Sequence, residues 1–259
     1  MDTMKTVILC GGRGMRLQEE TEYRPKPLVP VGGKPILWHI MQIYARAGFR
    51  EFVLCLGYKG DMIKDYFLNY EAMSSDFTVR LGGKSAVTYN SLHGEQDHMI
   101  TLADTGLDTM TGGRIKMVEK YLDGDTFMLT YGDGVSNVDI NALLKYHRSH
   151  GRIATVTVVH PVSRYGVLEI GPQDNVVNFA EKPVMKDWTS VGFFVFNRKL
   201  FDYLDGDDCF LEQEPLQRLT RDGQLMAYRH EGFFFPMDTY RDYVHLNDMW
   251  DKGHTPWIK

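Results

Sequence analysis

Strand-like and helix-like patterns alternate through the first 160 residues, and this alternation is what most constrains the fold. Short apolar runs that end at glycine predict strands, whereas apolar residues spaced by three and four predict helices. The predicted strands cover residues 6–10, 51–56, 126–131 and 153–159, with predicted helices at residues 36–47 and 61–67 between them. Alternating units of this kind build a mainly parallel sheet with helices on both faces. We therefore expect an α/β fold of the doubly wound, Rossmann-like class.

The other elements are shorter. We expect strands at residues 77–81 and 99–103, and a helix with Ile115 and Val118 on one face that starts after Gly113. Asn137 is predicted to cap the next helix. Beyond residue 160, strands are predicted at residues 167–170, 176–179 and 192–196, and a final helix carries Tyr243, Leu246, Met249 and Trp250. Since no repeat or low-complexity linker interrupts the sequence, we expect a single domain over residues 1–259.

Composition narrows the function classes. The 259 residues include 29 Lys plus Arg and 34 Asp plus Glu, and the net charge of −5 argues against a general binder of nucleic acid or of an anionic membrane. No apolar run approaches the roughly 18 residues that a membrane span needs, and the first apolar run is too short for a signal peptide. The three cysteines form no CxxC pair, so we expect reduced thiols in a cytoplasmic protein.

Three glycines and two arginines follow the first predicted strand. The segment reads Leu9-Cys10-Gly11-Gly12-Arg13-Gly14-Met15-Arg16-Leu17. Glycines at the end of a strand let backbone N–H groups approach a phosphate closely, and arginines add paired donors. The pattern is not a Walker loop, because no Gly-Lys-Ser/Thr follows, and Leu17 takes the place of the third glycine of a dinucleotide fingerprint. Taken alone, the segment fits a phosphate loop and a tight turn with solvated arginines equally well.

Further charged positions are candidates for the same site. Lys26 lies between two prolines, which stiffen the backbone around its ammonium group. Asp133 stands between glycines after a buried strand, a placement that suits a divalent metal bound by carboxylates and substrate phosphates. Asp238 follows an apolar run, and Glu181-Lys182 ends a short strand. Each has an ordinary alternative, namely a solvated lysine, an Asp-Gly turn, a helix N-cap and a surface ion pair.

The order of these signals resembles a known family. Residues 9–17, Lys26 in Pro-Lys-Pro and residues 31–36 are similar to the N-terminal signature of the sugar-1-phosphate nucleotidyltransferases, whose fold is doubly wound. Within that family the chain most resembles the glucose-1-phosphate cytidylyltransferases. The matching segments are residues 34–40 (KPILWHI), 57–60 (GYKG), 104–106 (DTG), 110–114 (MTGGR), 131–135 (YGDGV), 192–194 and 236–238. The similarity covers nearly the whole chain.

The resemblance implies that CTP and a sugar 1-phosphate, such as glucose 1-phosphate, give CDP-sugar and pyrophosphate. It implies that residues 1–160 mainly bind the nucleotide, and that residues 161–259 mainly bind the sugar phosphate, with a small β subregion for the sugar. The implied nucleotide-binding residues are Leu9, Cys10, Gly11, Gly12, Arg13, Gly14, Met15, Arg16, Lys26, Thr109 and Arg114. The implied sugar-phosphate-binding residues are Gly166, Glu181, Lys182, Ser190 and Val191.

Roles in the reaction follow from the same resemblance. Arg16, Lys26 and Asp133 are the expected catalytic residues, and Asp133 and Asp238 are the expected ligands of Mg²⁺. The attacking group is a phosphate oxygen with a second pKa of about 6, so it is largely dianionic at neutral pH and needs no general base. The site must instead position two anionic molecules and neutralise charge at the α-phosphate.

Some residues depart from the family pattern. Met15 stands where a Thr is usual, so a phosphate-facing hydroxyl is missing, and Cys10 replaces an Ala. Ser190-Val191 stands where the family has Asn-Gly. An Asn that bonds sugar hydroxyls discriminates strongly, because a buried polar group left unpaired is costly. The change at Ser190 therefore leaves the identity of the sugar phosphate open.

Several alternatives remain open from the sequence. One is a nucleotidyltransferase that uses another nucleotide, or another sugar or polyol phosphate. A second is a non-catalytic nucleotide-sugar sensor, which the joint presence of Arg16, Lys26, Asp133 and Asp238 disfavours. A glycosyltransferase is disfavoured because Gly-Asp-Gly replaces Asp-x-Asp. The family resemblance also implies a homo-oligomer, and the aromatic residues near the C-terminus fit either an interface or core packing.

Overall fold

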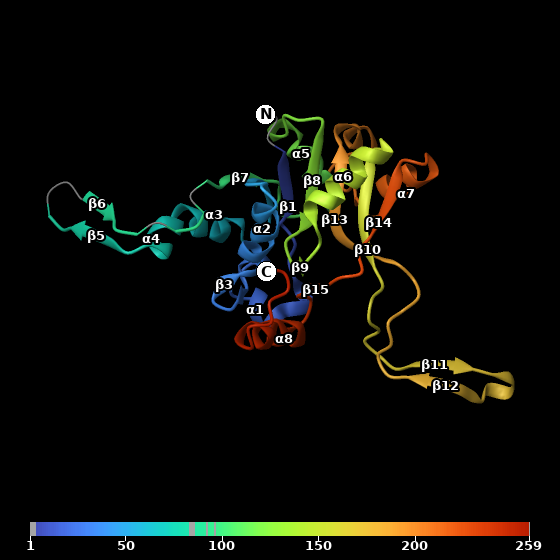
Figure 1. Cartoon of the computed structure of the whole chain (residues 1–259). Coiled ribbons are helices and arrows are strands. Elements are labelled where there is room, and N and C mark those ends of the chain that lie inside the picture. Colours follow the sequence, from blue (N-terminus) through green and yellow to red (C-terminus); the bar gives the residue numbers. More distant parts are fainter. Residues whose placement is uncertain (1–3, 83–85, 92, 96, 259) are drawn as a thin grey trace.

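The computed structural model describes residues 4–82, 86–91, 93–95 and 97–258. Its centre is a seven-stranded sheet in the order β14-β10-β13-β8-β1-β4-β7 (Figure 1). All strands of this sheet except β13 run in one direction. The strands are β1 (Lys5–Leu9), β4 (Glu51–Leu56), β7 (Met99–Asp104), β8 (Thr126–Tyr131), β10 (Ala154–Val159), β13 (Thr189–Asn197) and β14 (Leu225–Arg229). The predicted doubly wound, mainly parallel α/β fold is confirmed.

Helices cover both faces of the sheet, because successive residues of each strand point to opposite faces. In β1, Ile8 belongs to one apolar cluster, whereas Val7 and Leu9 belong to the other. The first cluster includes buried residues of α2 (Ile36–Arg46), α6 (Ile140–His150) and α8 (Tyr240–Asp251). The second includes buried residues of α5 (Thr111–Met117), the 3-10 helix η5 (Arg198–Tyr203) and α7 (Glu214–Arg221).

Short elements complete the chain. The remaining helices are α1 (Gln18–Thr21), α3 (Gly60–Leu68), α4 (Tyr70–Ser74), η1 (Met15–Leu17), η2 (Lys26–Leu28), η3 (Glu119–Tyr121) and η4 (Pro172–Asp174). Four two-stranded sheets pair β2 (Pro30–Val31) with β3 (Lys34–Pro35), β5 (Phe77–Arg80) with β6 (Ala86–Tyr89), β9 (Gly134–Ser136) with β15 (Phe234–Pro236), and β11 (Val167–Ile170) with β12 (Val176–Ala180). Among the described residues, none of the helices combines the length and the apolar character that crossing a bilayer requires.

Two local predictions were wrong. Asn137 does not cap α6; Asp139 does, and it accepts a hydrogen bond of 2.9 Å from the Ala142 N–H. The Asn137 side chain instead accepts from the Phe233 N–H at 2.7 Å, so it ties the β9 segment to the β15 segment. The second error concerns α5, which begins at Thr111 and contains both glycines that we expected before it. The carbonyl of Cys209 accepts from the N–H groups of both glycines, which satisfies donors at the helix start.

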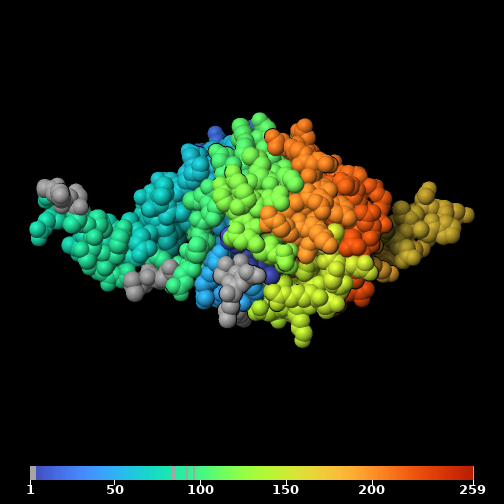
Figure 2. Space-filling model, turned by 90° about the horizontal axis from the view of Figure 1, so that it is seen from above, coloured from blue at the N-terminus to red at the C-terminus, as the bar shows by residue number. Residues whose placement is uncertain are grey.

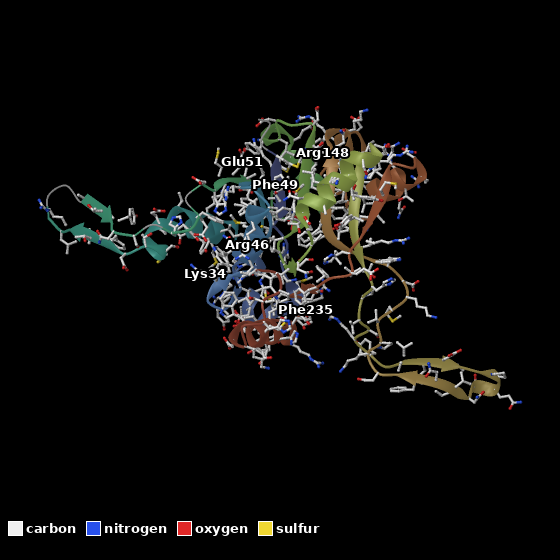
Figure 3. All side chains as sticks on the ribbon, in the orientation of Figure 1. Lys34, Arg46, Phe49, Glu51, Arg148 and Phe235 are labelled. Atoms are coloured by element: carbon white, nitrogen blue, oxygen red, sulfur yellow. The ribbon has the colours of Figure 1, made fainter. Side chains whose placement is uncertain are left out.

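Two hairpins extend from the body of the molecule in opposite directions. Figure 1 shows β5–β6 on one side and β11–β12 on the other, and Figure 2 shows the same two extensions from above. In Figure 3 the side chains of β11–β12 project into open space, whereas those of the central sheet are densely surrounded. All residues of β11 are exposed. The sequence predicted β11 and β12 as strands, and the family resemblance implied a small β subregion. These two strands do form a sheet of their own, whereas the third strand predicted after residue 160, β13, lies in the main sheet.

Candidate active site

The glycine-rich loop after β1 lines a cavity of about 400 Å³ at the carboxyl ends of β1 and β8. This edge is where ligands bind in open α/β sheets. Of the residues predicted to bind the nucleotide, all except Arg13 line the cavity, and Asp133 lines it too. The other lining residues are Pro27, Met110, Thr111, Tyr131, Gly132 and Phe210.

A second cavity, of about 470 Å³, lies elsewhere, between α2, the α3–α4 segment and β7. It is lined by aromatic residues and the carboxylates of Glu71 and Glu95, and no Lys or Arg is among its described lining residues. Such a lining repels a polyphosphate. The cavity beside the glycine-rich loop therefore fits a nucleotide better, although it is the smaller of the two.

Lys26 forms ion pairs with both of the predicted metal ligands, Asp133 and Asp238. Its Nζ lies 2.7 Å from Asp133 Oδ2 and 3.0 Å from Asp238 Oδ1, and the lysine is 8% exposed. The solvated lysine that the Pro-Lys-Pro segment also allowed is thus excluded. A charge this deeply buried is tolerated only with close partners of opposite sign.

The pairing of β15 with β9 brings the two aspartates together. Pro236 is opposite Gly134, and the Met237 N–H donates to the Asp133 carbonyl at 2.8 Å. The N-cap alternative for Asp238 is wrong, since Thr239 caps α8 and Asp242 completes a capping box with it. The Asp238 side chain is therefore left facing Lys26.

Arginines add to the positive charge around Asp238. Arg16 Nη1 lies 3.1 Å from Asp238 Oδ2, and Arg164 Nη2 lies 3.9 Å from the same oxygen. Burial alone would raise the pKa of Asp238, but Lys26, then Arg16 and Arg164, hold the pKa of this carboxyl below its usual value. Asp238 therefore stays ionised at neutral pH. Arg164 was not predicted from the sequence, where it had no motif of its own.

Asp133 and Asp238 suit a divalent metal. One ammonium group contacts both, so a single cation at that position reaches an oxygen of each. Mg²⁺ is commonly held by one or two carboxylates together with substrate phosphates and water. In the described part of the chain no group of three or more His, Cys, Asp or Glu could hold a metal without such help. The donor set therefore fits a metal that arrives with a phosphate substrate.

Arg114 lines the cavity beside the glycine-rich loop and is 5% exposed. Its Nη1 donates to the carbonyls of Leu56 and Gly106 at 2.9 and 2.7 Å, and its Nη2 to the carbonyl of Gly11 at 3.3 Å. A Cβ on Gly11 would lie 2.2 Å from Arg114 Nη1, so a glycine is needed there. Through these hydrogen bonds Arg114 holds together the three backbone segments that carry Gly11, Leu56 and Gly106.

Arg13 stands apart from the cavity lining. Its Nη2 lies 2.9 Å from Asp108 Oδ1, and both side chains are more than half exposed. This pair links the glycine-rich loop to the segment that carries Thr109. An exposed pair of this kind contributes little to stability.

The cysteines are structural. Burial raises the pKa of the Cys55 thiol to about 12, and it raises that of Cys10 well above its usual value. Cys10, Cys55 and Cys209 are free thiols, and the first two are buried. A protonated thiol is a poor nucleophile. The expectation of reduced, small apolar cysteines is confirmed for Cys10 and Cys55, while Cys209 is half-buried.

The residues predicted for the sugar side occupy two places. Gly166, Glu181 and Lys182 lie together at the base of the β11–β12 hairpin, where Lys182 Nζ is 3.4 Å from Glu181 Oε1. Ser190 and Val191 are the second and third residues of β13, which enters the main sheet at the edge where β8 ends. Ser190 is exposed, whereas Val191 is 5% exposed and packs in the core. Only Ser190 of this pair therefore presents a side chain to a ligand.

Comparison with known proteins identifies the family. The model of the family described as nucleotidyl transferase matches residues 5–234. The chain belongs to that family. It is 46% identical over 257 residues to a glucose-1-phosphate cytidylyltransferase of Salmonella typhi, with 98% of each chain covered. It is 45% identical to a probable glucose-1-phosphate cytidylyltransferase of Bacillus subtilis (strain 168), with 98% of this chain and 99% of the relative covered.

Solved structures agree on the fold of this nucleotidyl transferase. HddC from Yersinia pseudotuberculosis, crystallised in complex with GMP-PN, gives a TM-score of 0.71 at 22% identity and covers 95% of this chain and 99% of its own. A likeness at this identity supports the architecture alone. The family membership rests on the full-length sequence similarity.

Proposed function

We propose that this chain transfers the cytidylyl group of CTP to a sugar 1-phosphate, with glucose 1-phosphate as the best-supported acceptor, and releases pyrophosphate. The observation that carries the proposal is the bridge from Lys26 to both Asp133 and Asp238 beside a glycine-rich loop. The relatives that match over the full chain support cytidylyl transfer to glucose 1-phosphate. In this proposal residues 1–160 mainly hold the nucleotide and residues 161–259 mainly hold the sugar phosphate.

The chemistry follows from the charges. A sugar-phosphate oxygen attacks the α-phosphorus of CTP, a new P–O bond forms there, and the bond to the β-phosphate oxygen breaks and leaves pyrophosphate. Lys26 stabilises charge between the two phosphates, and Arg16, which is 74% exposed at its side chain, turns to the departing pyrophosphate. Asp133 and Asp238 would hold Mg²⁺, which supplies charge neutralisation when bound. Backbone N–H groups of residues 10–14 contact the triphosphate.

The test is release of pyrophosphate in the presence of Mg²⁺. CTP, dTTP, UTP, GTP and ATP are each offered with a panel of sugar 1-phosphates that includes glucose 1-phosphate. Turnover with CTP and glucose 1-phosphate that EDTA abolishes is the expected result. Turnover only with another nucleotide would contradict the cytidylyl assignment, and no release with any pair would favour a non-catalytic sensor.

A second acceptor is favoured by one observation. Ser190 is exposed at the start of β13 and is shorter than the family's Asn, so the position reaches less far toward a ligand. A sugar or polyol phosphate with a larger substituent at that place fits the same site. CTP-dependent release that prefers such an acceptor to glucose 1-phosphate would establish this alternative.

We also propose that the protein forms a homo-oligomer. The β11–β12 hairpin exposes apolar side chains, among them Leu168 at 49%, Ile170 at 67% and Phe179 at 60%. Exposed apolar groups of this size are costly in water and are typical of interaction surfaces. Light scattering after size exclusion should give a multiple of 29.8 kDa. A mass of one chain at micromolar concentration would contradict the proposal.

A further inference from the structure

Arg164 lies where the chain leaves β10 for the β11–β12 hairpin. The turn around it is held by backbone and side-chain bonds: the Ser163 N–H donates to the Pro183 carbonyl at 2.9 Å, and Ser163 Oγ donates to the Tyr165 carbonyl at 2.8 Å. Val162 also pairs with Val184 across the hairpin base. These bonds fix the backbone of residue 164 beside the residues predicted to hold the sugar phosphate.

The Arg164 side chain reaches the other half of the site. Its Nη2 lies 3.5 Å from Asp242 Oδ2 and 3.9 Å from Asp238 Oδ2. Asp242 already accepts from the N–H groups of Asp238 and Thr239, at 3.2 and 2.9 Å, in the capping of α8. Arg164 thus connects the hairpin base to the segment that carries the predicted metal ligand.

Cations crowd the Asp238 carboxylate. Lys26 contacts Oδ1, while Arg16 and Arg164 both approach Oδ2. With Asp242, which pairs with Arg164, three carboxylates balance these three cations. Two of the cations nevertheless approach the same oxygen of Asp238. A divalent cation that binds Oδ2 is repelled by both guanidinium groups unless they move. The Arg164 side chain is 55% exposed, so it is free to turn away.

We propose that Arg164 competes with the divalent cation for Asp238 in the substrate-free protein and binds the sugar phosphate once the metal has displaced it. The inference rests on the proposed function. Gly166, Glu181 and Lys182 lie at the hairpin base together with Arg164. A phosphate that binds these residues is therefore near the Arg164 side chain. A guanidinium offers such a phosphate two parallel hydrogen bonds, which a lysine cannot do.

The ordinary alternative is a clamp that merely attaches the hairpin to α8. A clamp and a competitor differ in the sign of their effect on metal binding. Loss of a clamp loosens the site and leaves metal affinity equal or weaker, whereas loss of a competing cation makes metal binding tighter. Metal affinity measured without substrate therefore distinguishes the two.

The experiment compares wild type with Arg164→Gln and with Lys186→Gln. Lys186 is exposed on the chain that returns from the same hairpin, so its variant makes the same change in net charge. Binding of Mn²⁺ alone is followed by electron paramagnetic resonance, and binding of glucose 1-phosphate in the presence of Mn²⁺ by calorimetry. We expect Arg164→Gln to bind Mn²⁺ about fivefold more tightly and glucose 1-phosphate about tenfold more weakly, with Lys186→Gln unchanged in both.

The outcomes separate this inference from the proposed function. Equal Mn²⁺ binding by wild type and Arg164→Gln, including none in either, overturns the competition, and unchanged glucose 1-phosphate binding overturns the role in holding phosphate. Tighter Mn²⁺ binding by Lys186→Gln as well would reduce the effect to net charge and also overturns the inference. Asp238→Asn tests the metal site itself: if it binds Mn²⁺ as wild type does, the proposed metal ligands are wrong whatever Arg164 does.

Discussion

The nucleotide side and the sugar side of the molecule are built in contrasting ways. The first is a cavity at the edge of a seven-stranded sheet, with Lys26 and Arg114 buried and bonded to several segments. The second includes the base of a two-stranded hairpin whose strands are exposed on both faces. Rigid placement suits groups that stabilise a transition state, because a small displacement there costs much rate. In a hairpin that is attached only by its base, residues can be substituted with little effect on the packing of the core.

The largest expected effect comes from breaking the buried cluster. Lys26→Ala or Asp133→Asn should lower kcat at least ~10²-fold, as the loss of one transition-state donor does elsewhere. Lys26→Ala additionally leaves two carboxylates without their shared ammonium group. Pyrophosphate release by the folded variants measures the effect, with the exposed Lys145→Ala as control. A folded variant with near-normal turnover would remove that residue from the site.

Gly192 lies on β13 next to Ser190 and Val191, and it also packs against the nucleotide cavity. Its replacement should lower the stability of the fold. Its φ is +77°, and a Cβ would lie 2.1 Å from the ring of Tyr131, which lines the cavity. Gly192→Ala should destabilise the fold by about 1–3 kcal/mol through backbone strain and displacement of the ring. Urea unfolding measures the change. Gly206→Ala, where nothing lies within 4 Å, should be close to neutral, and equal costs for the two variants would refute the explanation.

The stability of the fold should also depend on pH, because His39 is buried in the core. Burial lowers the pKa of His39 to about 4, and its Nδ1 accepts from Trp257 Nε1, which requires the neutral ring. The unfolded chain takes up a proton near pH 6.5. The stability that the neutral ring contributes is therefore present above pH 6.5 and falls as the pH drops from 6.5 to 4, by about 1.4 kcal/mol per pH unit.

Urea unfolding of wild type and His39→Phe between pH 7 and pH 4.5 checks this prediction. The variant should show a shallower dependence of the free energy of unfolding on pH, whatever its absolute stability. Identical slopes would mean that His39 does not titrate below its ordinary range in the folded protein.

The smallest expected effect lies on the sugar side. Ser190→Asn restores the family's residue at an exposed position, so it should raise kcat/KM for glucose 1-phosphate by about fivefold relative to other acceptors. The KM for CTP should stay within experimental error, because Ser190 lies outside the nucleotide cavity. A change in CTP kinetics of the same size would show that the two sides are not as separate as their structures indicate.

Part of the protein could be predicted from the sequence alone. The alternation of patterns gave the sheet and helices because a strand's apolar run and a helix's apolar spacing are local properties of the chain. β4 and β8 begin and end where the patterns predicted. The set of candidate residues came from motif order, and most of its nucleotide half lines one cavity.

Other features were decided only by tertiary structure. Asp133 and Asp238 are 105 positions apart, and they meet because β15 pairs with β9, two strands too short to carry a pattern. Arg164 gives no local signal, and its importance appears only when the hairpin base reaches α8. Arg114 was predicted to contact the nucleotide, yet its donors hold backbone carbonyls from distant segments. Periodicity and propensity describe neighbours in the sequence, whereas these contacts depend on the pairing of segments that only the folded chain brings together.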